Sequence, residues 1–182
     1  AFWSGLQPIR GKHYEKISTM MQANLGLYSA HIPLDLHPIY GNNRALADLI
    51  GLENLESFGE YDGIKIGLKG LLPAISTEKL AELLEEKLDS KVKVIGKGEV
   101  KTVGLVTGGA ADIVRQAIQE GLDCYSKGES ANHHFHEATE GNCILIFAGH
   151  YATETGGVKS IGKHLKEKFG IASEFLHYPT GL

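Results

Sequence analysis

This sequence of 182 residues lacks the features typical of disulfide-bonded and membrane proteins, since it has few cysteines and no long apolar segment. It has two cysteines, Cys124 and Cys143, each beside or within an apolar strand and without metal-binding spacing. We therefore expect buried free thiols in a reducing compartment and no disulfide. No run approaches the roughly 18 apolar residues of a membrane span, and no basic-then-apolar leader opens the chain. These absences predict a cytoplasmic protein without a membrane partner.

A strong charge of either sign is absent as well. Lys and Arg number 18 against 22 Asp and Glu, which leaves a formal net charge of −4. Such a charge gives no electrostatic reason to expect nucleic acid as the main partner. With 42% hydrophobic and 22% charged residues, the composition is ordinary for a globular protein. The length suits one sizeable domain or two small lobes.

The sequence also has no methionine at its start, where it reads Ala1-Phe2-Trp3. Two large aromatic residues at a terminus are more typical of the interior of a sequence. We therefore expect this chain to be a fragment of a longer protein.

The spacing of apolar residues predicts helices that alternate with strands, which favours an α/β fold with parallel or mixed sheets. The acidic stretch 52–63 is predicted to be a polar loop. Strands are predicted over residues 27–31, 64–72, 92–95, 102–106, 122–125, 144–148 and 174–178. Helices are predicted over residues 12–25, 44–50, 76–88, 110–120, 129–140 and 155–168, with Asn42 and Asn43 capping the second and Ser76 or Thr77 the third.

The chain is organised around the stretch ILIFAGHYATETGG, residues 144–157. A short apolar run predicts a buried strand, and His150 and Glu154 follow where the strand leads into a helix. Ligands of open α/β sheets collect at the carboxyl ends of strands, and imidazole and carboxylate groups bind zinc, manganese and iron. In the simpler alternative, His150 bonds a loop and Glu154 caps the helix.

A second candidate is Asp35, in the segment HIPLDLHP between His31 and His37. Two prolines here disfavour regular structure, and the surroundings are apolar. A buried carboxylate has to be paired, hydrogen-bonded or metal-bound. The alternative is a turn aspartate that binds nearby backbone N–H groups.

A histidine-rich helix is the third candidate. His133 and His136 are three residues apart and therefore share a face, which Glu129 and Glu140 can join. This spacing can build a metal site, although it is not the HExxH pattern. A polar helix face bordering a cleft explains the same residues.

The turn 107–109, Thr-Gly-Gly, precedes a predicted helix and is the fourth candidate. A glycine-rich turn at a helix start can bind phosphate. The turn lacks the complete dinucleotide or P-loop pattern, so a simple tight turn is the favoured explanation.

Taken together, these motifs resemble the Nif-three-like proteins, also called dinuclear-metal-centre hexameric proteins or GTP cyclohydrolase I type 2 homologues. The resemblance covers essentially the whole chain, with the motifs in the family's order. The matching segments are LYSAHIPLDLHPIYGNNRALADLIGL, VTGGAADIVRQAIQEGLD, SKGESANHHFHEA, AGHYATETGGVKSIGKHL and FLHYPTGL.

The resemblance implies two interlocked α/β lobes with mixed sheets, assembled as a toroidal homohexamer with two metal ions in a cleft of each subunit. We therefore expect a single Nif-three-like domain over residues 1–182, truncated at its N-terminus. One lobe would comprise about residues 1–60 plus 140–182, and the other about residues 61–139.

The resemblance also assigns metal ligands. The family's aspartate in its LD motif matches Asp35, and its GHxxTE motif matches His150 and Glu154. The family's His-His-Gly motif stands immediately before the Phe-Trp pair that matches residues 2–3, so we expect that pair of ligands to be missing. Three side chains can hold one ion with open positions, and a second ion would require His31 or His136. Zinc, manganese, iron and nickel all suit such donors. Four further residues are candidates for contacts to ligands or substrate: His31, Glu129, His133 and His136.

The function that the resemblance implies is metal-dependent hydrolysis of a purine nucleotide or similar small molecule. A metal-activated water would attack an electrophilic carbon or phosphorus while a second ion holds the leaving oxygen. Without the His-His pair we expect reduced or absent activity. One alternative is a non-catalytic hexameric scaffold that binds metal or partners. Another is a nucleotide-binding module without chemistry, which rests on the turn 107–109 alone.

Overall fold

The computed structural model describes residues 5, 7–109 and 113–180. The chain divides into two compact units, Ala1–Ala30 and His31–Leu182. In the first unit, α1 (Gly11–Gln22) is the predicted helix, and it ends earlier than expected because Asn24 turns the backbone into the left-handed region at φ +50°. None of its residues is buried. The strand predicted over residues 27–31 does not form, since no described strand pairs with it.

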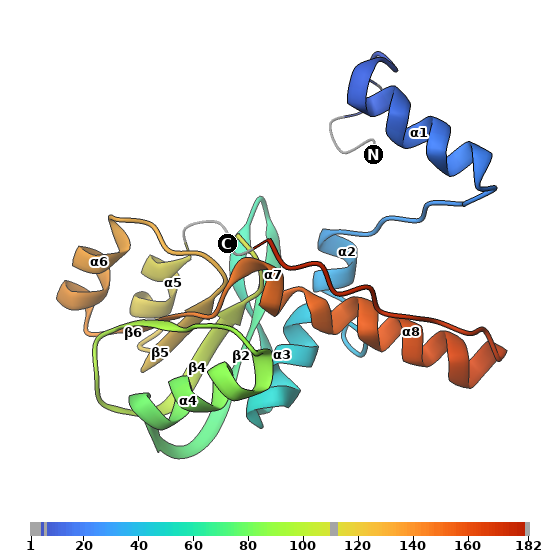
Figure 1. Ribbon diagram of the computed structural model, residues 1–182. Coiled ribbons are helices and arrows are strands. Elements are labelled where there is room, and N and C mark those ends of the chain that lie inside the picture. The colour runs from blue at the N-terminus through green and yellow to red at the C-terminus, as the bar shows by residue number, and fades with distance from the viewer. Residues whose placement is uncertain (1–4, 6, 110–112, 181–182) are drawn as a thin grey trace. The chain divides into compact units, whose positions relative to one another are not determined.

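The second unit is built on a six-stranded mixed sheet in the order β1-β2-β4-β5-β6-β3 (Figure 1). Strands β4, β5 and β6 run parallel, while β1, β2 and β3 are antiparallel to their neighbours. The predicted α/β class with a mixed sheet is therefore confirmed. The strand bounds are β1 (Glu53–Tyr61), β2 (Ile64–Ser76), β3 (Lys93–Ile95), β4 (Glu99–Val106), β5 (Cys124–Lys127) and β6 (Ile144–Phe147).

Strand β1 corrects the prediction of a polar loop over residues 52–63. It lies at the edge of the sheet, where acidic side chains can reach solvent. The large side chain that it buries is that of Phe58, at 1% exposure. Asp62 and Gly63 both have positive φ and connect β1 to β2 as a hairpin. An Asp-Gly pair between two strand-like runs is a hairpin signal, and it is the signal that the polar interpretation missed.

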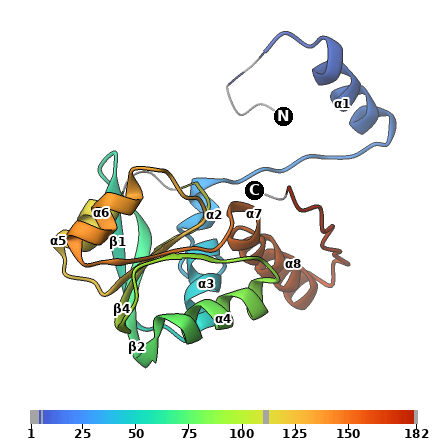
Figure 2. The same cartoon turned by 60° about the vertical axis from the view of Figure 1, so that its left-hand side comes forward.

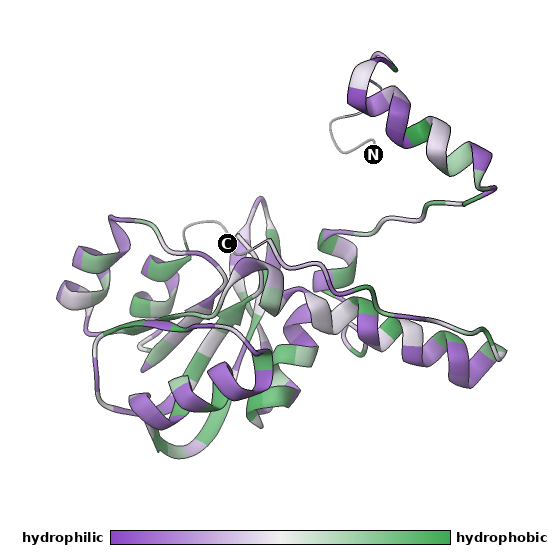
Figure 3. Ribbon diagram, in the orientation of Figure 1, coloured by the Kyte–Doolittle hydropathy of each residue, from purple (hydrophilic) through white to green (hydrophobic). Residues whose placement is uncertain are grey.

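Helices cover both faces of the sheet. One core packs α3 (Asn42–Ile50) and α4 (Thr77–Leu88) against one face, and a second core packs α5 (Val114–Gln119) and α6 (His134–Gly141) against the other. Figure 3 shows the hydrophobic colouring concentrated on the strands and the hydrophilic colouring along α4 and α8. Ser76 caps α4 by accepting a bond from the Lys79 N–H, as predicted.

Three further helices belong to the described part of the second unit. They are α2 (Ile32–Asp35), α7 (His150–Thr153), which follows β6, and α8 (Thr155–Phe169), which packs against α3. No helix of the described residues is long and apolar enough to cross a membrane.

Three predicted elements differ in detail. The start of the helix predicted over 110–120 lies outside the described residues, and α5 begins at Val114. The helix predicted from residue 129 begins at His134, which leaves Glu129 in the loop after β5. Residues 174–178 are extended without joining a described strand, and they return alongside α8 (Figure 2).

Candidate metal centre

The candidate centre forms beyond the carboxyl ends of the three parallel strands. Gly108 follows β4, Glu129 follows β5 and His150 follows β6, and parallel strands end at the same edge of a sheet. The turn from β6 into α7 then brings Glu154 to the same place, since Glu154 joins α7 to α8. Loops far apart in the sequence therefore converge at one edge, as expected for a ligand site of an α/β fold.

His31, Asp35 and Glu154 form a group that could hold a metal ion, with one donor atom from each residue all within 4.8 Å of one another. His31 is exposed, whereas Asp35 and Glu154 are half-buried. One imidazole and two carboxylates are donors that zinc, manganese and iron accept. The sequence analysis named His31 as a secondary contact or as a ligand of a second ion, and the structure places it beside Asp35 and Glu154.

A single helical turn, α2, explains how His31 and Asp35 meet. The Asp35 N–H donates to the His31 carbonyl at 3.1 Å, so the two residues lie one turn apart. The prediction that the prolines prevent regular structure is wrong here. Pro33 lies in the first turn of the helix, where its missing N–H is not needed.

Asp35 is held by Asn42, whose side-chain amide donates to the Asp35 carboxylate at 2.7 Å. Burial raises the pKa of Asp35, and it outweighs the opposing effects of the Asn42 bond and of the nearby His31 and His150 charges. Asp35 is therefore a partly desolvated carboxylate that benefits from a positive neighbour. This confirms that it is not an ordinary solvated acid.

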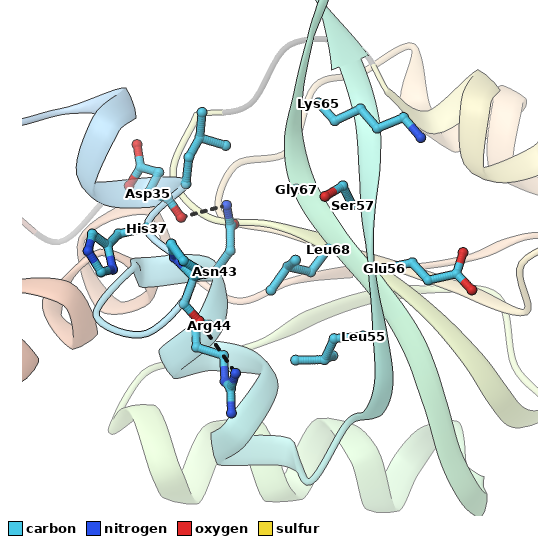
Figure 4. A pocket seen from close by; sticks show the side chains of 12 residues that line it. Asp35, His37, Asn43, Arg44, Leu55, Glu56, Ser57, Lys65, Gly67 and Leu68 are labelled. Atoms are coloured by element: carbon cyan, nitrogen blue, oxygen red, sulfur yellow. Dashed lines mark hydrogen bonds between the residues drawn. The ribbon is translucent and has the colours of Figure 1, made fainter.

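Asn42 and Asn43 do not cap α3, contrary to the prediction, because the cap position belongs to Gly41. Their buried side chains connect the site instead. The side-chain Oδ1 of Asn42 accepts from the Gly157 N–H at 2.6 Å, which ties Asp35 to the start of α8. Asn43 donates to the Asp35 carbonyl at 3.0 Å (Figure 4) and accepts from the Thr107 N–H at 2.9 Å. Sequence reasoning missed this role, because Thr107 and Gly157 lie far from the two asparagines in the sequence.

His150 lies between two carboxylates. Its Nδ1 pairs with Glu129, and its Nε2 is 3.3 Å from Glu154. Burial alone would lower the pKa of His150, but the Glu129 hydrogen bond and the Glu154 and Glu129 charges outweigh burial and raise it. A metal-binding histidine commonly has its second ring nitrogen held by a carboxylate in this way. Glu154 stands at the N-cap position of α8, as the simpler alternative expected, but its side chain makes no cap hydrogen bond there and lies beside His150 instead.

The glycine turn after β4 provides space for these side chains. Gly108 has φ +71°, and a Cβ added there would overlap the Glu154 carboxylate. A Cβ on Gly109 would lie 3.1 Å from Glu129 Oε2. The Thr107 and Gly108 N–H groups are already engaged by Asn43 and by the Thr153 hydroxyl. These bonds favour a tight turn over a phosphate cradle. Residues 110–112, where a helix start was predicted, lie outside the described residues.

The histidine-rich helix does not contribute to the group. His133, which precedes α6, and His136 on α6 are both exposed, and neither belongs to the metal-type group found among the described residues. His134 is buried and stacks on Phe147, and its Nδ1 accepts from the Ala131 N–H. The exposure of His133 and His136 favours the alternative of a polar helix face over a metal site. Cys124 and Cys143 are buried and unbridged, as predicted, and burial raises the pKa of Cys143 to about 11.

Two clefts adjoin the site residues. The larger, of about 560 Å³, contains Glu129, His150 and Glu154 in its lining. The smaller, of about 310 Å³, lies between α2–α3 and the β1–β2 hairpin, with Asp35 in its lining. Figure 4 shows Asp35 and Asn43 across this space from Leu55 and Leu68.

Comparison with known proteins supports the resemblance. The family described as Duf34/NIF3 (NGG1p interacting factor 3) matches residues 1–179. The "GTP cyclohydrolase 1 type 2 homolog" of Deinococcus radiodurans is 39% identical over 185 residues, covering 100% of this chain and 70% of that protein. The structure of TTHA1606 from Thermus thermophilus has a TM-score of 0.84 and 35% identity, covering 100% of this chain and 73% of the other. Protein ybgI, of unknown function, has a TM-score of 0.88 and 31% identity, covering 100% and 74%. The chain therefore belongs to the Duf34/NIF3 family.

Proposed function

We propose that this chain is a metal-binding protein that acts as a metal-dependent hydrolase on a small molecule or nucleotide. The observation that carries the proposal is the convergence of His31, Asp35 and Glu154, with the Glu129–His150 pair beside them and a cleft alongside. The name "GTP cyclohydrolase 1 type 2 homolog" of the relatives points to the same class of reaction.

The residues present fit divalent metal ions. His31, Asp35 and Glu154 would hold one ion, and Gly108 leaves room for the Glu154 carboxylate beside it. We propose that His150, with Glu154 shared between the two, would hold a second ion of the dinuclear centre, because its Nε2 already faces Glu154. The donors suit zinc, manganese, iron or nickel.

Bound divalent ions supply Lewis acidity, which polarises an electrophilic centre and makes water more acidic. The side chains of this protein would orient the groups that bind the ions and would transfer protons. Glu129 fixes the His150 ring through Nδ1, and its exposed carboxylate lines the cleft, where it can accept the proton of the attacking water. Hydrolysis then places the hydroxyl group on the electrophilic carbon or phosphorus and the proton on the leaving group.

The family resemblance leads us to propose further features of the whole protein. These are the two interlocked lobes, about residues 1–60 plus 140–182 and about 61–139, a homohexamer with two ions per subunit, and a cytoplasmic location. Nucleic acid and membranes are not proposed as partners, since the net charge is only −4.

Product release from GTP tests the proposed activity. The chain is assayed with added Zn²⁺ or Mn²⁺ beside Asp35→Ala and Glu154→Ala. We expect slow metal-dependent release that both substitutions abolish, because each removes a proposed ligand. Equal rates in the three proteins would contradict the proposal for this substrate. Metal binding without turnover would favour the non-catalytic scaffold.

A further inference from the structure

The larger cleft has two walls of different chemistry. Glu129, His150 and Glu154 form its ionisable end. The rest of the lining is largely apolar or uncharged and comes from α7, α8 and the C-terminal segment. These residues are Tyr151, Thr155, Val158, Phe175, Leu176 and Thr180.

Phe175 is the aromatic anchor of the apolar wall. The residue is 37% exposed and therefore retains surface that a ligand can cover. The Lys159 ammonium lies over the Phe175 ring, 4.5 Å from its centroid. Such a cation–π contact orients the ring at the edge of the cleft.

The segment that carries Phe175 is fixed on both sides. Before it, the Ser173 hydroxyl donates to the Gly162 carbonyl at 3.0 Å. After it, the Tyr178 N–H donates to the Tyr151 hydroxyl at 2.8 Å. Figure 2 shows this segment returning beside α8. Because Tyr151 directly follows His150, the second bond ties the apolar wall to the ionisable end.

We propose that this wall binds a planar ring, so that the site takes small molecules whose hydrolysable group is attached to an aromatic or heteroaromatic ring. The inference rests on the proposed function and defines its substrate class. The cleft volume of about 560 Å³ falls within the range of roughly 300–1,000 Å³ for small-molecule sites. A ring over Phe175 and Val158 gains apolar contact and aromatic packing, while its polar substituent reaches Glu154 and His150.

Two phosphonates that differ only in the ring test the proposal. Phenylphosphonate and methylphosphonate offer the same kind of metal-binding anion, and calorimetric titration into the Zn²⁺-loaded full chain measures both affinities. We expect phenylphosphonate to bind roughly 3- to 10-fold more tightly, as one good aromatic contact allows. Phe175→Ala should bring the ratio close to one, and Phe175→Leu should leave an intermediate ratio.

Phe169→Ala is the matched control. Phe169 is also exposed and also has a lysine ammonium over its ring, that of Lys168 at 5.3 Å, but it lies outside the cleft lining. Its substitution should leave the ratio unchanged. Thermal melting of each variant verifies folding.

The outcomes separate this inference from the proposed function. Metal-dependent binding of both phosphonates with equal affinity, or a ratio that Phe175→Ala leaves intact, would overturn the ring-binding wall and leave the metal centre standing. Absence of phosphonate binding at normal metal content would also overturn the wall. Absence of bound metal in the same samples would overturn the proposed function and, with it, this inference.

Discussion

Two regions of the protein are rich in side chains that can bind metal: the start of α6, and the dispersed site formed by His31, Asp35 and Glu154. They differ in how far apart their residues lie in the sequence. At the start of α6, three histidines occur within residues 133–136. In the other region, His31 and Asp35 are separated from Glu154 by more than half of the sequence, yet their donor atoms lie within 4.8 Å of one another. The histidines that lie close together in the sequence do not belong to the metal-type group found among the described residues. That group is formed by residues that lie far apart in the sequence.

The difference has a geometric cause. Helical side chains fan out around the axis, so His134 points into the core while His133 and His136 remain exposed. Parallel strands instead direct their following loops to a common edge. A site at such an edge can therefore collect residues from any part of the chain.

Among the substitutions that test the difference between these two regions, substitution of Glu154 should have the largest effect on metal affinity. Glu154→Gln removes the carboxylate that approaches both Asp35 and His150, and we expect metal affinity to fall by more than about 100-fold, since even the loss of a partner of a ligand costs about 10- to 100-fold. His136→Gln is the control on α6 and should leave affinity within about twofold of the parent. Competition with a metal-sensitive dye measures both. Equal losses would contradict the distinction between the two regions.

Asn43→Ala should destabilise the fold that brings the dispersed residues together. Asn43 bonds the Asp35 and Ile66 carbonyls and the Thr107 N–H from a buried position. Leaving these groups unsatisfied should lower the free energy of unfolding by roughly 2–4 kcal/mol. Asn132→Ala, at an exposed position before α6, should cost less than about 0.5 kcal/mol. Urea denaturation measures the free energy of unfolding of both variants. Similar losses would show that the Asn43 hydrogen bonds do not hold the site residues together.

Glu129→Gln should have an intermediate effect on metal binding. The substitution keeps the shape of the side chain but weakens its hold on His150 Nδ1, and we expect affinity to fall by roughly 10- to 100-fold. Glu140→Gln, an exposed acid on α6, provides the isosteric control. If Glu129→Gln bound metal as well as Glu140→Gln, Glu129 would not orient the ligand.

Gly108→Ala should have the smallest effect, with a control that carries the same backbone strain. Gly108 and Gly121 have φ of +71° and +69°, but only the added Cβ at Gly108 would meet the Glu154 carboxylate, and at Gly121 it would meet nothing within 4 Å. Each substitution should cost about 1 kcal/mol of stability. Metal affinity should fall several-fold in Gly108→Ala alone. A similar fall in Gly121→Ala would attribute the loss to strain.

The sequence predicts the local part of the site well. An apolar strand followed by a polar turn indicated that β6 leads into α8, although the short helix α7 between them was not predicted. The apolar surroundings of Asp35 indicated its burial. The partnership of His31 with Glu154 could not be read from the sequence, because it depends on where α2 lies relative to the sheet. The Asn42 and Asn43 bonds were hidden for the same reason. Strands expected at 27–31 and 174–178 are absent from the described ladders, since a strand requires a partner and not only a pattern.

Metal content per chain tests the central claim most directly. Inductively coupled plasma mass spectrometry is applied to protein purified without added metal, beside Asp35→Ala and the double variant His133→Gln/His136→Gln. The dispersed site predicts that the parent and the histidine double variant retain metal and that Asp35→Ala loses it. Metal retained by Asp35→Ala and lost from the double variant would contradict the claim and place the centre on α6.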